Sequence, residues 1–339
     1  MEISVVIPTH KRPEFLRSAL SSVAAQTRLD LVHEVIISEN GNDDRSSKVC
    51  EEFSELPLRY LQRVPALDAL CHFETLVRDA NAPWVAWIGD DDMWSRYHLA
   101  EANRGLTANP DAVGFISACA LVSNESRRIW GGEGLTFESS LWQGSDGVSD
   151  IEPWGLNRMY LESLVRAPVN PWGLVCRKQP LVVALQKWRQ TSTAWDSDRL
   201  FMCLLAQHGM LAVGREIGLF YRRHPQNETS KQSSNPRTRE RASGETTRML
   251  IEEAKKSGID LRLDWDRAWR AMTPVQREAY LYGSSLGACQ ALREVWGRAA
   301  LELGVKQSPG SLVKAAGRMA CPPVVWQALS EMRSRWLRT

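Results

Sequence analysis

The chain has 339 residues, of which 43% are hydrophobic, and its formal net charge at pH 7 is +2. This length fits one enlarged α/β domain plus a smaller unit, and the small net charge argues against nucleic acid as a main partner. Seven scattered cysteines without a C-x-x-C pair favour reduced thiols in a cytoplasmic protein over a disulfide framework or a zinc site. We also expect no signal peptide, and no apolar run approaches the ~20 residues that span a bilayer.

The first third of the chain alternates between strand-like and helix-like patterns. Short β-branched runs without a polar side predict buried parallel strands, and apolar residues at helical spacing predict the helices between them. Because the two patterns alternate, the sequence predicts a doubly wound α/β sheet. Strands are expected at residues 3–7, 34–38, 58–61 and 84–88, and helices at residues 15–23 and 67–80.

The strand predicted at residues 84–88 is followed at once by three consecutive carboxylates, Asp90, Asp91 and Asp92. Like charges packed together cost stability unless a cation or strong donors hold them. In open α/β sheets, ligands bind at the carboxyl ends of the strands, and carboxylates suit Mg²⁺ or Mn²⁺ carrying a substrate phosphate. The alternative is an acidic turn that caps the next helix, for which one or two Asp would serve. Three in a row therefore favour a metal–phosphate site.

Five segments, taken together, resemble the family 2 glycosyltransferases of GT-A fold. They follow the order of that family's motifs and span about two-thirds of the chain. The resemblance implies a Rossmann-like, doubly wound mixed sheet. It also implies an inverting transfer of a sugar from a nucleotide-diphosphate sugar to a hydroxyl of a glycan or lipid-linked glycan, as in surface polysaccharide or O-antigen biosynthesis. The segments are residues 4–13, 36–44, 88–92, 196–209 and 221–224.

The resemblance also implies a role for each polar residue of the donor site. Asp91 is the expected direct ligand of a Mn²⁺ or Mg²⁺ ion, with Asp92 and His224 as further metal-binding residues. Glu39 matches the acid that reads the base, and a carboxylate can accept from uracil, thymine or guanine, so UDP, dTDP and GDP donors all stay open. The expected donor contacts are Pro8, Thr9, Arg12, Glu39, Asp90, Arg222 and His224.

An acceptor hydroxyl needs a proton acceptor as it attacks. Residues 196–209 resemble the family segment that holds the catalytic base, which makes Asp198 the candidate for this role. Asp near a helix N-terminus is also a common capping residue, and Asp196 is the better N-cap of the helix that follows. Trp172 precedes the strand expected at residues 174–176, which places it near the acceptor sugar in this fold. A core Trp at a turn is the alternative for Trp172.

The family's Arg-Asn pair, which helps to hold the diphosphate, is absent from the corresponding residues 70–74. His72 stands in that stretch and either replaces the missing phosphate contact or lies on a helix surface. We favour the surface position.

The sequence divides into a GT-A domain at residues 1–230, a mobile polar linker or lid at residues 231–247, and a helical C-terminal region at residues 248–339. The last helix carries a stripe that includes Leu329 and Trp336, with basic residues beside it. Such a helix either packs on the catalytic domain or makes peripheral contact with the inner face of an anionic membrane.

Two other classes of function remain as alternatives. A sugar-nucleotide nucleotidyltransferase would need a Gly-rich basic loop after the first strand, whereas residues 8–12 contain no Gly. A non-catalytic nucleotide-sugar-binding module would have lost the base or the carboxylates, and all of them are present.

Overall fold

The computed structural model describes residues 1–122, 128–130, 151–165, 170–190, 197–227, 246, 249–250 and 252–259. Most of the predicted lid and of the predicted C-terminal region, including its last helix, lies outside the described residues. In chain order the elements are β1 (Ile3–Thr9), α1 (Pro13–Ala24), η1 (Leu29–Leu31), β2 (Val32–Glu39), α2 (Arg45–Glu51), β3 (Leu58–Gln62), α3 (Ala69–Asp79), β4 (Trp84–Trp87), β5 (Met93–Trp94), α4 (His98–Ala108), β6 (Gly114–Val122), β7 (Arg128–Trp130), β8 (Ile151–Trp154), α5 (Leu156–Val165), η2 (Pro171–Gly173), β9 (Leu174–Arg177), α6 (Lys178–Arg189), α7 (Asp198–Ala206) and β10 (Leu211–Arg222).

The described strands form one mixed sheet in the order β3-β2-β1-β4-β9-β6-β10-β5, with β7 beside β6 and β8 beside β10. Strands β1 to β4 pair in parallel, and β9 lies antiparallel between β4 and β6. The chain builds outward from β1 to β3 and then returns to place β4 on the other side of β1. This reversal of strand order creates a switch point between β1 and β4, where open α/β sheets bind ligands.

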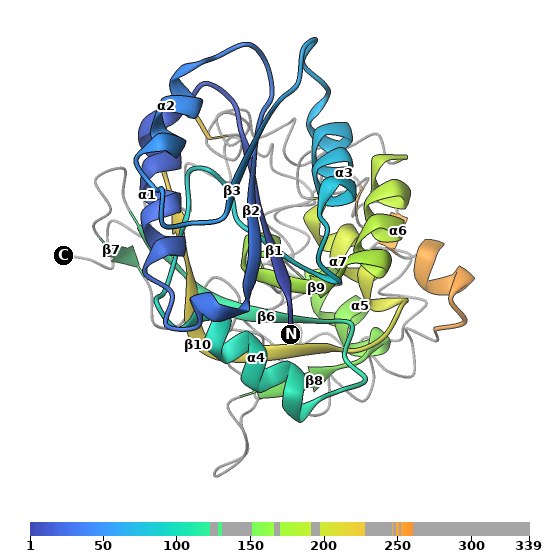
Figure 1. Cartoon of the computed structure of the whole chain (residues 1–339). Coiled ribbons are helices and arrows are strands. Elements are labelled where there is room, and N and C mark those ends of the chain that lie inside the picture. The colour runs from blue at the N-terminus through green and yellow to red at the C-terminus, as the bar shows by residue number, and fades with distance from the viewer. Residues whose placement is uncertain are drawn as a thin grey trace, which may run out of the picture.

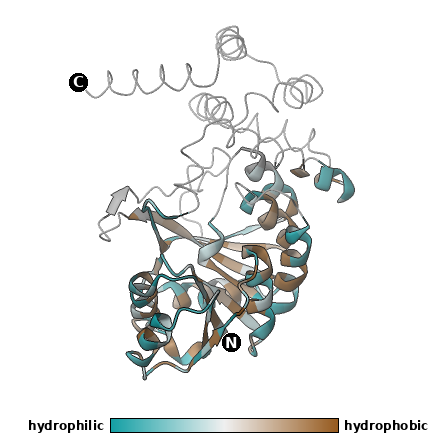
Figure 2. Cartoon of the chain, turned by 90° about the horizontal axis from the view of Figure 1, so that it is seen from above, coloured by the Kyte–Doolittle hydropathy of each residue, from teal (hydrophilic) through white to brown (hydrophobic). Residues whose placement is uncertain are grey.

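Helices cover both faces of the sheet, so the predicted α/β fold is confirmed (Figure 1). One core cluster joins the sheet to α1, α2 and α4, and the other joins it to α3, α5, α6 and α7. In Figure 2 the strands between the helices are mainly hydrophobic, whereas the helices also carry hydrophilic residues. This distribution matches the strongly apolar strand runs in the sequence, because parallel strands buried on both faces have no polar side.

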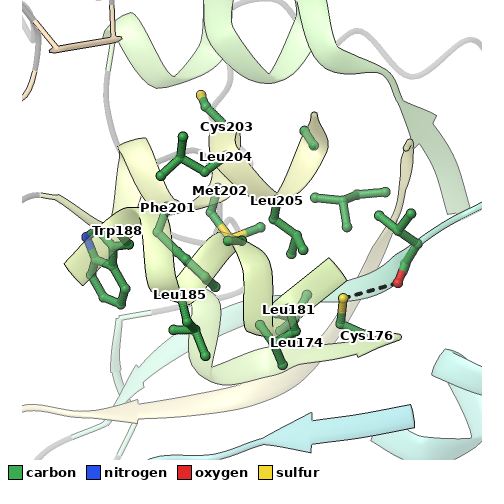
Figure 3. Close-up of a cluster of buried hydrophobic side chains, with 14 of the residues drawn as sticks. Leu174, Cys176, Leu181, Leu185, Trp188, Phe201, Met202, Cys203, Leu204 and Leu205 are labelled. Atoms are coloured by element: carbon green, nitrogen blue, oxygen red, sulfur yellow. Dashed lines mark hydrogen bonds between the residues drawn. The ribbon is translucent and has the colours of Figure 1, made fainter. Parts of the chain in front are cut away.

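Large apolar side chains from α6, α7 and β9 fill the second cluster (Figure 3). Phe201 of α7 is fully buried and lies against both Trp188 and Trp87, with ring centroids 4.9 and 5.8 Å apart. Helix α7 is therefore packed beneath the end of β4, the strand that leads into the three aspartates.

The residues described near the start of the C-terminal region, 246, 249–250 and 252–259, pack on the same face as α6 and α7. Leu250 and Ala254 are fully buried in the second cluster, and Lys187 of α6 forms an ion pair with Glu253 at 2.5 Å. The beginning of the predicted C-terminal region thus contributes to the core of the sheet. Within the described ranges, no helix is both long and apolar enough to cross a membrane.

Glu34 ties the first strands together at the end of the sheet opposite the aspartates. Its carboxylate accepts hydrogen bonds from Ser4 Oγ at 2.7 Å, Asn81 N at 2.6 Å and Arg59 Nε at 3.1 Å. Burial raises the pKa of this carboxyl, but the bonds from Ser4 and Asn81 and the charge of Arg59 outweigh burial, so the pKa lies below its usual value.

Replacing Glu34 by Gln should lower the free energy of unfolding at pH 7 by about 1–3 kcal/mol, because charge-assisted bonds are lost in a buried site. The folded pKa is depressed, so the stabilisation is complete above the unfolded pKa of about 4.3 and disappears as the pH falls through the folded value. Urea unfolding at pH 7 and pH 3 measures both effects, with the exposed Glu55→Gln as control. Equal losses at the two pH values would contradict the linkage.

Candidate active site

The candidate site lies at the switch point between β1 and β4. Asp90 follows β4, and its Oδ2 accepts a hydrogen bond of 2.8 Å from Thr9 Oγ1 at the end of β1. Thr9 in turn pairs in register with Glu39 at the end of β2. Three neighbouring strand ends therefore bring together residues that are widely separated in the sequence, at the edge predicted for ligand binding.

The three aspartates have different surroundings. Asp90 is 5% exposed and Asp92 is fully buried, whereas the side chain of Asp91 is 16% exposed. Asp92 Oδ1 accepts the backbone N–H of Arg222 at 2.9 Å, and its Oδ2 has no hydrogen-bond partner among the described residues. Asp91 is thus the carboxylate most open to a ligand. Asp92 holds the aspartate loop, residues 90–92, against β10.

Burial and mutual repulsion make the ionised forms of Asp90 and Asp92 unfavourable. Burial, followed by the charge of Asp91, raises the pKa of Asp90 to about 7. Burial and then Asp91 also raise the pKa of Asp92 well above its usual value. A carboxylate whose pKa rises for these reasons gains stability when a cation binds beside it.

Two basic side chains converge on Asp91. Its Oδ2 lies 3.0 Å from Arg12 Nη1 and 2.9 Å from His224 Nε2, a residue 133 positions later in the chain. Arg12 also reaches Asp90 Oδ1 at 3.2 Å, so one guanidinium bridges two of the three carboxylates. The ring of Phe15 lies 4.5 Å from that of His224 and fixes the imidazole from the α1 side.

Arg222 fastens the end of β10 to the aspartate loop. Its side chain is almost fully buried, and its Nε donates to the backbone carbonyl of Asp91 at 2.8 Å. The guanidinium also lies over the ring of Phe15, 5.2 Å from the centroid. Arg222 therefore supports the loop, and a contact of Arg222 with a donor phosphate remains a prediction.

The donor set suits a divalent cation. Asp91 and His224 provide an oxygen and an imidazole nitrogen side by side, and a Mg²⁺-type ion is commonly held by one or two carboxylates plus substrate phosphates. The described residues contain no ready-made group of three or more His, Cys, Asp or Glu that could hold a metal alone. A cation bound here would therefore need further ligands from the donor or from water.

Glu39 is fully buried, with both oxygens already bonded within the chain. Oε1 accepts the backbone N–H of Lys11 at 3.1 Å, and Oε2 accepts Ser46 Oγ at 2.6 Å. Lys11 has a φ of +56°, so this bond holds the loop after β1 in a left-handed turn. Pro8 lies within β1, opposite Ser38 of β2. Base recognition by Glu39 stays a prediction.

The surface position favoured for His72 is wrong. His72 of α3 is 3% exposed, and its Nε2 lies 2.8 Å from Ser38 Oγ at the end of β2, because this face of α3 packs on the sheet. Burial, followed by the charge of Arg63, lowers the pKa of His72 to about 4. The imidazole is neutral at pH 7 and offers no positive charge to a phosphate.

Trp172 and Asp198 lie on the other side of the same strand end. Trp172 in η2 is half-buried, and its ring stands edge-on to those of Trp87 and Phe73, 4.7 and 5.4 Å away. Asp198 is the first residue of α7, one helical turn before Phe201, which touches Trp87. Both residues thus border the end of β4, and their acceptor and base roles stay predictions.

The predicted N-cap of α7 is wrong by one residue. Ser197 occupies that position, and its hydroxyl accepts Trp188 Nε1 at 2.9 Å and does not cap the helix. Asp196 itself lies outside the described residues. Asp198 Oδ1 accepts the N–H of its neighbour Arg199 at 3.0 Å.

Sequence reasoning missed the bridge that Arg12 makes between Asp90 and Asp91, and the support of Glu39 by Ser46. A signal for the first contact was present in the sequence, because the basic residues 10–12 follow the first predicted strand. No signal in the sequence pointed to Ser46, because short polar residues in turns are common.

Comparison with known proteins agrees with this geometry. Residues 4–164 match the sequence model of the family described as glycosyl transferase family 2. The match covers just under half of the chain and confirms the predicted resemblance to family 2. The matched region runs from β1 to α5 and therefore includes the three aspartates.

Curated proteins with similar sequences are named as glycosyltransferases. The chain is 24% identical over 322 residues to the uncharacterized glycosyltransferase alr2836 of Nostoc sp., covering 90% of this chain and 89% of the relative. It is 29% identical over 94 residues to glycosyltransferase GlyA of Streptococcus pneumoniae, covering 27% of this chain and 13% of GlyA. The match thus spans only a small part of GlyA.

Solved structures with a similar fold include residues 1–349 of S. aureus TarS. The complex of that protein with UDP-GlcNAc has a TM-score of 0.56 and 13% identity, over 94% of this chain and 89% of the other. A second structure of the same fragment gives a TM-score of 0.53 over 94% and 80% of the two chains, at the same identity. These similarities confirm the predicted GT-A fold.

Proposed function

We propose that the protein is an inverting glycosyltransferase that moves a sugar from a nucleotide-diphosphate sugar to a hydroxyl of a glycan or lipid-linked glycan. The observation that carries the proposal is the aspartate loop at the β1–β4 switch point, with His224 and Arg12 on Asp91. The match to family 2 and the UDP-GlcNAc complex of TarS support a nucleotide-sugar donor. We place the reaction in surface polysaccharide or O-antigen biosynthesis, in the cytoplasm at the inner face of the membrane.

In the proposed reaction, the acceptor oxygen attacks the anomeric carbon from the face opposite the diphosphate. The bond between that carbon and the diphosphate oxygen breaks, and the nucleoside diphosphate leaves. Asp198 takes the proton of the acceptor hydroxyl, and Trp172 positions the acceptor ring. Asp91 and His224, with Asp92 behind them, would hold a Mn²⁺ or Mg²⁺ ion, whose charge would offset that of the leaving diphosphate.

The remaining donor contacts come from the strand ends. In this proposal Thr9 and Pro8 border the nucleotide. Asp90 accepts hydrogen bonds from the ribose hydroxyls, and Glu39 accepts a hydrogen bond from the base. Arg12 lies within reach of the phosphates and shares its charge between them and the aspartates. These assignments require a donor that enters along the ends of β1 and β2.

The experiment that tests the function incubates the protein with UDP-, dTDP- and GDP-sugars, Mn²⁺ or Mg²⁺, and a panel of glycan acceptors. Release of nucleoside diphosphate with a new glycoside of inverted anomeric configuration, read by NMR, is the expected result. Release of pyrophosphate would instead identify a nucleotidyltransferase. Binding of the donors without turnover in any acceptor mixture would favour a non-catalytic module.

Replacing Arg12 by Gln should raise the KM for the donor about tenfold, with a smaller effect on kcat, because one phosphate contact is worth about 1.5–3 kcal/mol at most. Its side chain is 25% exposed, so the fold does not depend on its burial. Steady-state kinetics at varied donor concentration provide the measurement, with the exposed Arg28→Gln as control. An unchanged KM with a lower melting temperature would limit Arg12 to neutralising the aspartates.

A further inference from the structure

A cavity lies beside a local irregularity of the sheet, away from the donor site. Between Val213 and Ile217, three residues of β10 face the single residue Ser117 of β6, and another register shift follows at Gly218. A cavity of about 340 Å³ lies beside this irregularity and is lined by residues of β6, β10 and the start of α4. Bulges of this kind often lie beside binding sites, because they open the sheet and redirect side chains.

The floor of the cavity carries polar atoms without partners. His98 is fully buried and Ser117 is 1% exposed, yet both ring nitrogens and the Ser117 hydroxyl have no hydrogen-bond partner within the part of the chain that the structure describes. A buried polar group left unpaired costs about 1–3 kcal/mol. Burial lowers the pKa of His98 to about 3, so at pH 7 its neutral ring offers one donor and one acceptor.

Two glycines, Gly218 and Gly173, pack directly against these side chains. A Cβ on Gly218 would lie 2.4 Å from Ser117 Oγ and 2.5 Å from His98 Nδ1, and a Cβ on Gly173 would lie 2.8 Å from Ser117 Oγ. Only glycine fits at these two positions with the side chains where they are. Because both positions are glycine, no side chain from them covers the hydroxyl or the imidazole.

The charged side chains at the rim indicate which charge a ligand in this cavity can carry. Among the described lining residues, Glu216 and Glu101 bring two carboxylates, and the guanidinium of Arg104 is paired with Glu101 at 2.5 Å. The excess of negative charge disfavours an anion, and the described residues contain no group of three or more His, Cys, Asp or Glu that could hold a metal in this cavity. Tyr97, whose ring is 54% exposed, supplies an aromatic surface at the same rim. Donors, acceptors and an aromatic ring without net positive charge fit a neutral ligand rich in hydroxyls.

We propose that this cavity binds a single sugar ring, and so forms a second carbohydrate site besides the donor site. Its volume is at the low end of the ~300–1,000 Å³ typical of ligand pockets, which suits one ring better than a nucleotide. The proposal that a sugar binds here stands on the cavity alone.

The cavity is connected to the aspartate loop. The ring of His98 stacks on that of Trp94 with centroids 4.5 Å apart, and Trp94 follows Asp92 by two residues. Gly218 precedes Arg222 by four residues of strand, or about 13 Å at 3.3 Å per residue. A ring in the cavity is therefore a remote unit of an acceptor glycan whose reacting hydroxyl lies at the aspartates. This second step rests on the proposed function.

Binding is tested on the full chain with the methyl glycosides of glucose, galactose, mannose and N-acetylglucosamine. Saturation-transfer NMR detects contact, and titration calorimetry in the presence of UDP measures affinity with the donor site filled. At least one glycoside should bind saturably. Ser117→Ala should weaken it about five- to tenfold, since one hydrogen bond is lost. Because Ser117 Oγ has no hydrogen-bond partner among the described residues, this variant should fold normally.

Glu216→Gln should also weaken the glycoside, and Glu55→Gln, another exposed acid far from the cavity in the sequence, should not. Asp91→Asn should bind the glycoside as the parent does, which keeps this proposal separate from the donor chemistry. Failure of all four glycosides to bind would mean that the cavity holds only water and would overturn the proposal. So would unchanged affinity in Ser117→Ala, or competition by inorganic phosphate.

Discussion

Replacing Asp91 by Asn is expected to lower kcat for sugar transfer by about 10²–10³-fold or more, the cost typical of losing one electrostatic contact to a developing charge. Asn keeps an oxygen that can accept from Arg12 and His224, so the local geometry should survive. The loss concerns the negative charge that would bind a divalent cation together with His224. Divalent-dependent binding of the nucleoside diphosphate should weaken in parallel.

The same substitution should leave the melting temperature unchanged or raise it. The charge of Asp91 contributes to the raised pKa values of both Asp90 and Asp92, so its removal relieves repulsion in the folded state. Thermal unfolding and metal-dependent nucleotide binding by calorimetry make the measurement, and Asp30→Asn, an exposed acid to amide change, is the control. Full turnover by Asp91→Asn would place the cation, if any, on other residues.

Replacing Asp198 by Asn is expected to lower kcat by about 10²–10⁴-fold, the usual contribution of a general base. Asn has nearly the same size and can still accept from the N–H of Arg199, so α7 should begin as before. Donor affinity should barely change, because the base acts on the acceptor. Donor binding by calorimetry beside steady-state transfer separates the two effects.

A purely structural role for Asp198 predicts a different outcome. An acid in the first turn of a helix contributes about 0.3–1 kcal/mol through the helix dipole, and its loss would lower stability slightly without affecting kcat. Glu14→Gln is the matched control, since Glu14 lies in the first turn of α1 and forms only an exposed ion pair with Arg17. Near-normal kcat in Asp198→Asn would move the base role to another carboxylate.

The sequence was sufficient for the parts of the fold that depend on local pattern. The β-branched runs that became β1 and β2 are apolar on both sides, which only a central strand requires, and three carboxylates after a buried strand have few structural uses. The family resemblance could be recognised, and was confirmed, because the family's motifs are short runs of residues at strand ends. Such features depend on neighbouring residues and on distinctive side-chain chemistry.

The remaining features depend on contacts between distant segments. The burial of His72 follows from how α3 packs over Ser38, and the pairing of His224 with Asp91 spans 133 residues. The register shifts of β10 against β6 opposite Ser117 have no signal in the amino-acid composition. Polar residues such as Ser117 and His98 are unremarkable in sequence, and only their burial without partners distinguishes them.

The position of β9 bears on the order in which the chain can fold during synthesis. This strand lies between β4, which ends at residue 87, and β6, which begins at residue 114, yet it is made only at residues 174–177. Until it emerges from the ribosome, the facing edges of β4 and β6 lack their partner and are open to pairing with other chains. Completing the sheet also requires contacts between residues far apart in sequence, which slows folding. The strand that joins the two halves of the sheet is thus made late, and its emergence covers two of the edges through which the nascent protein can aggregate.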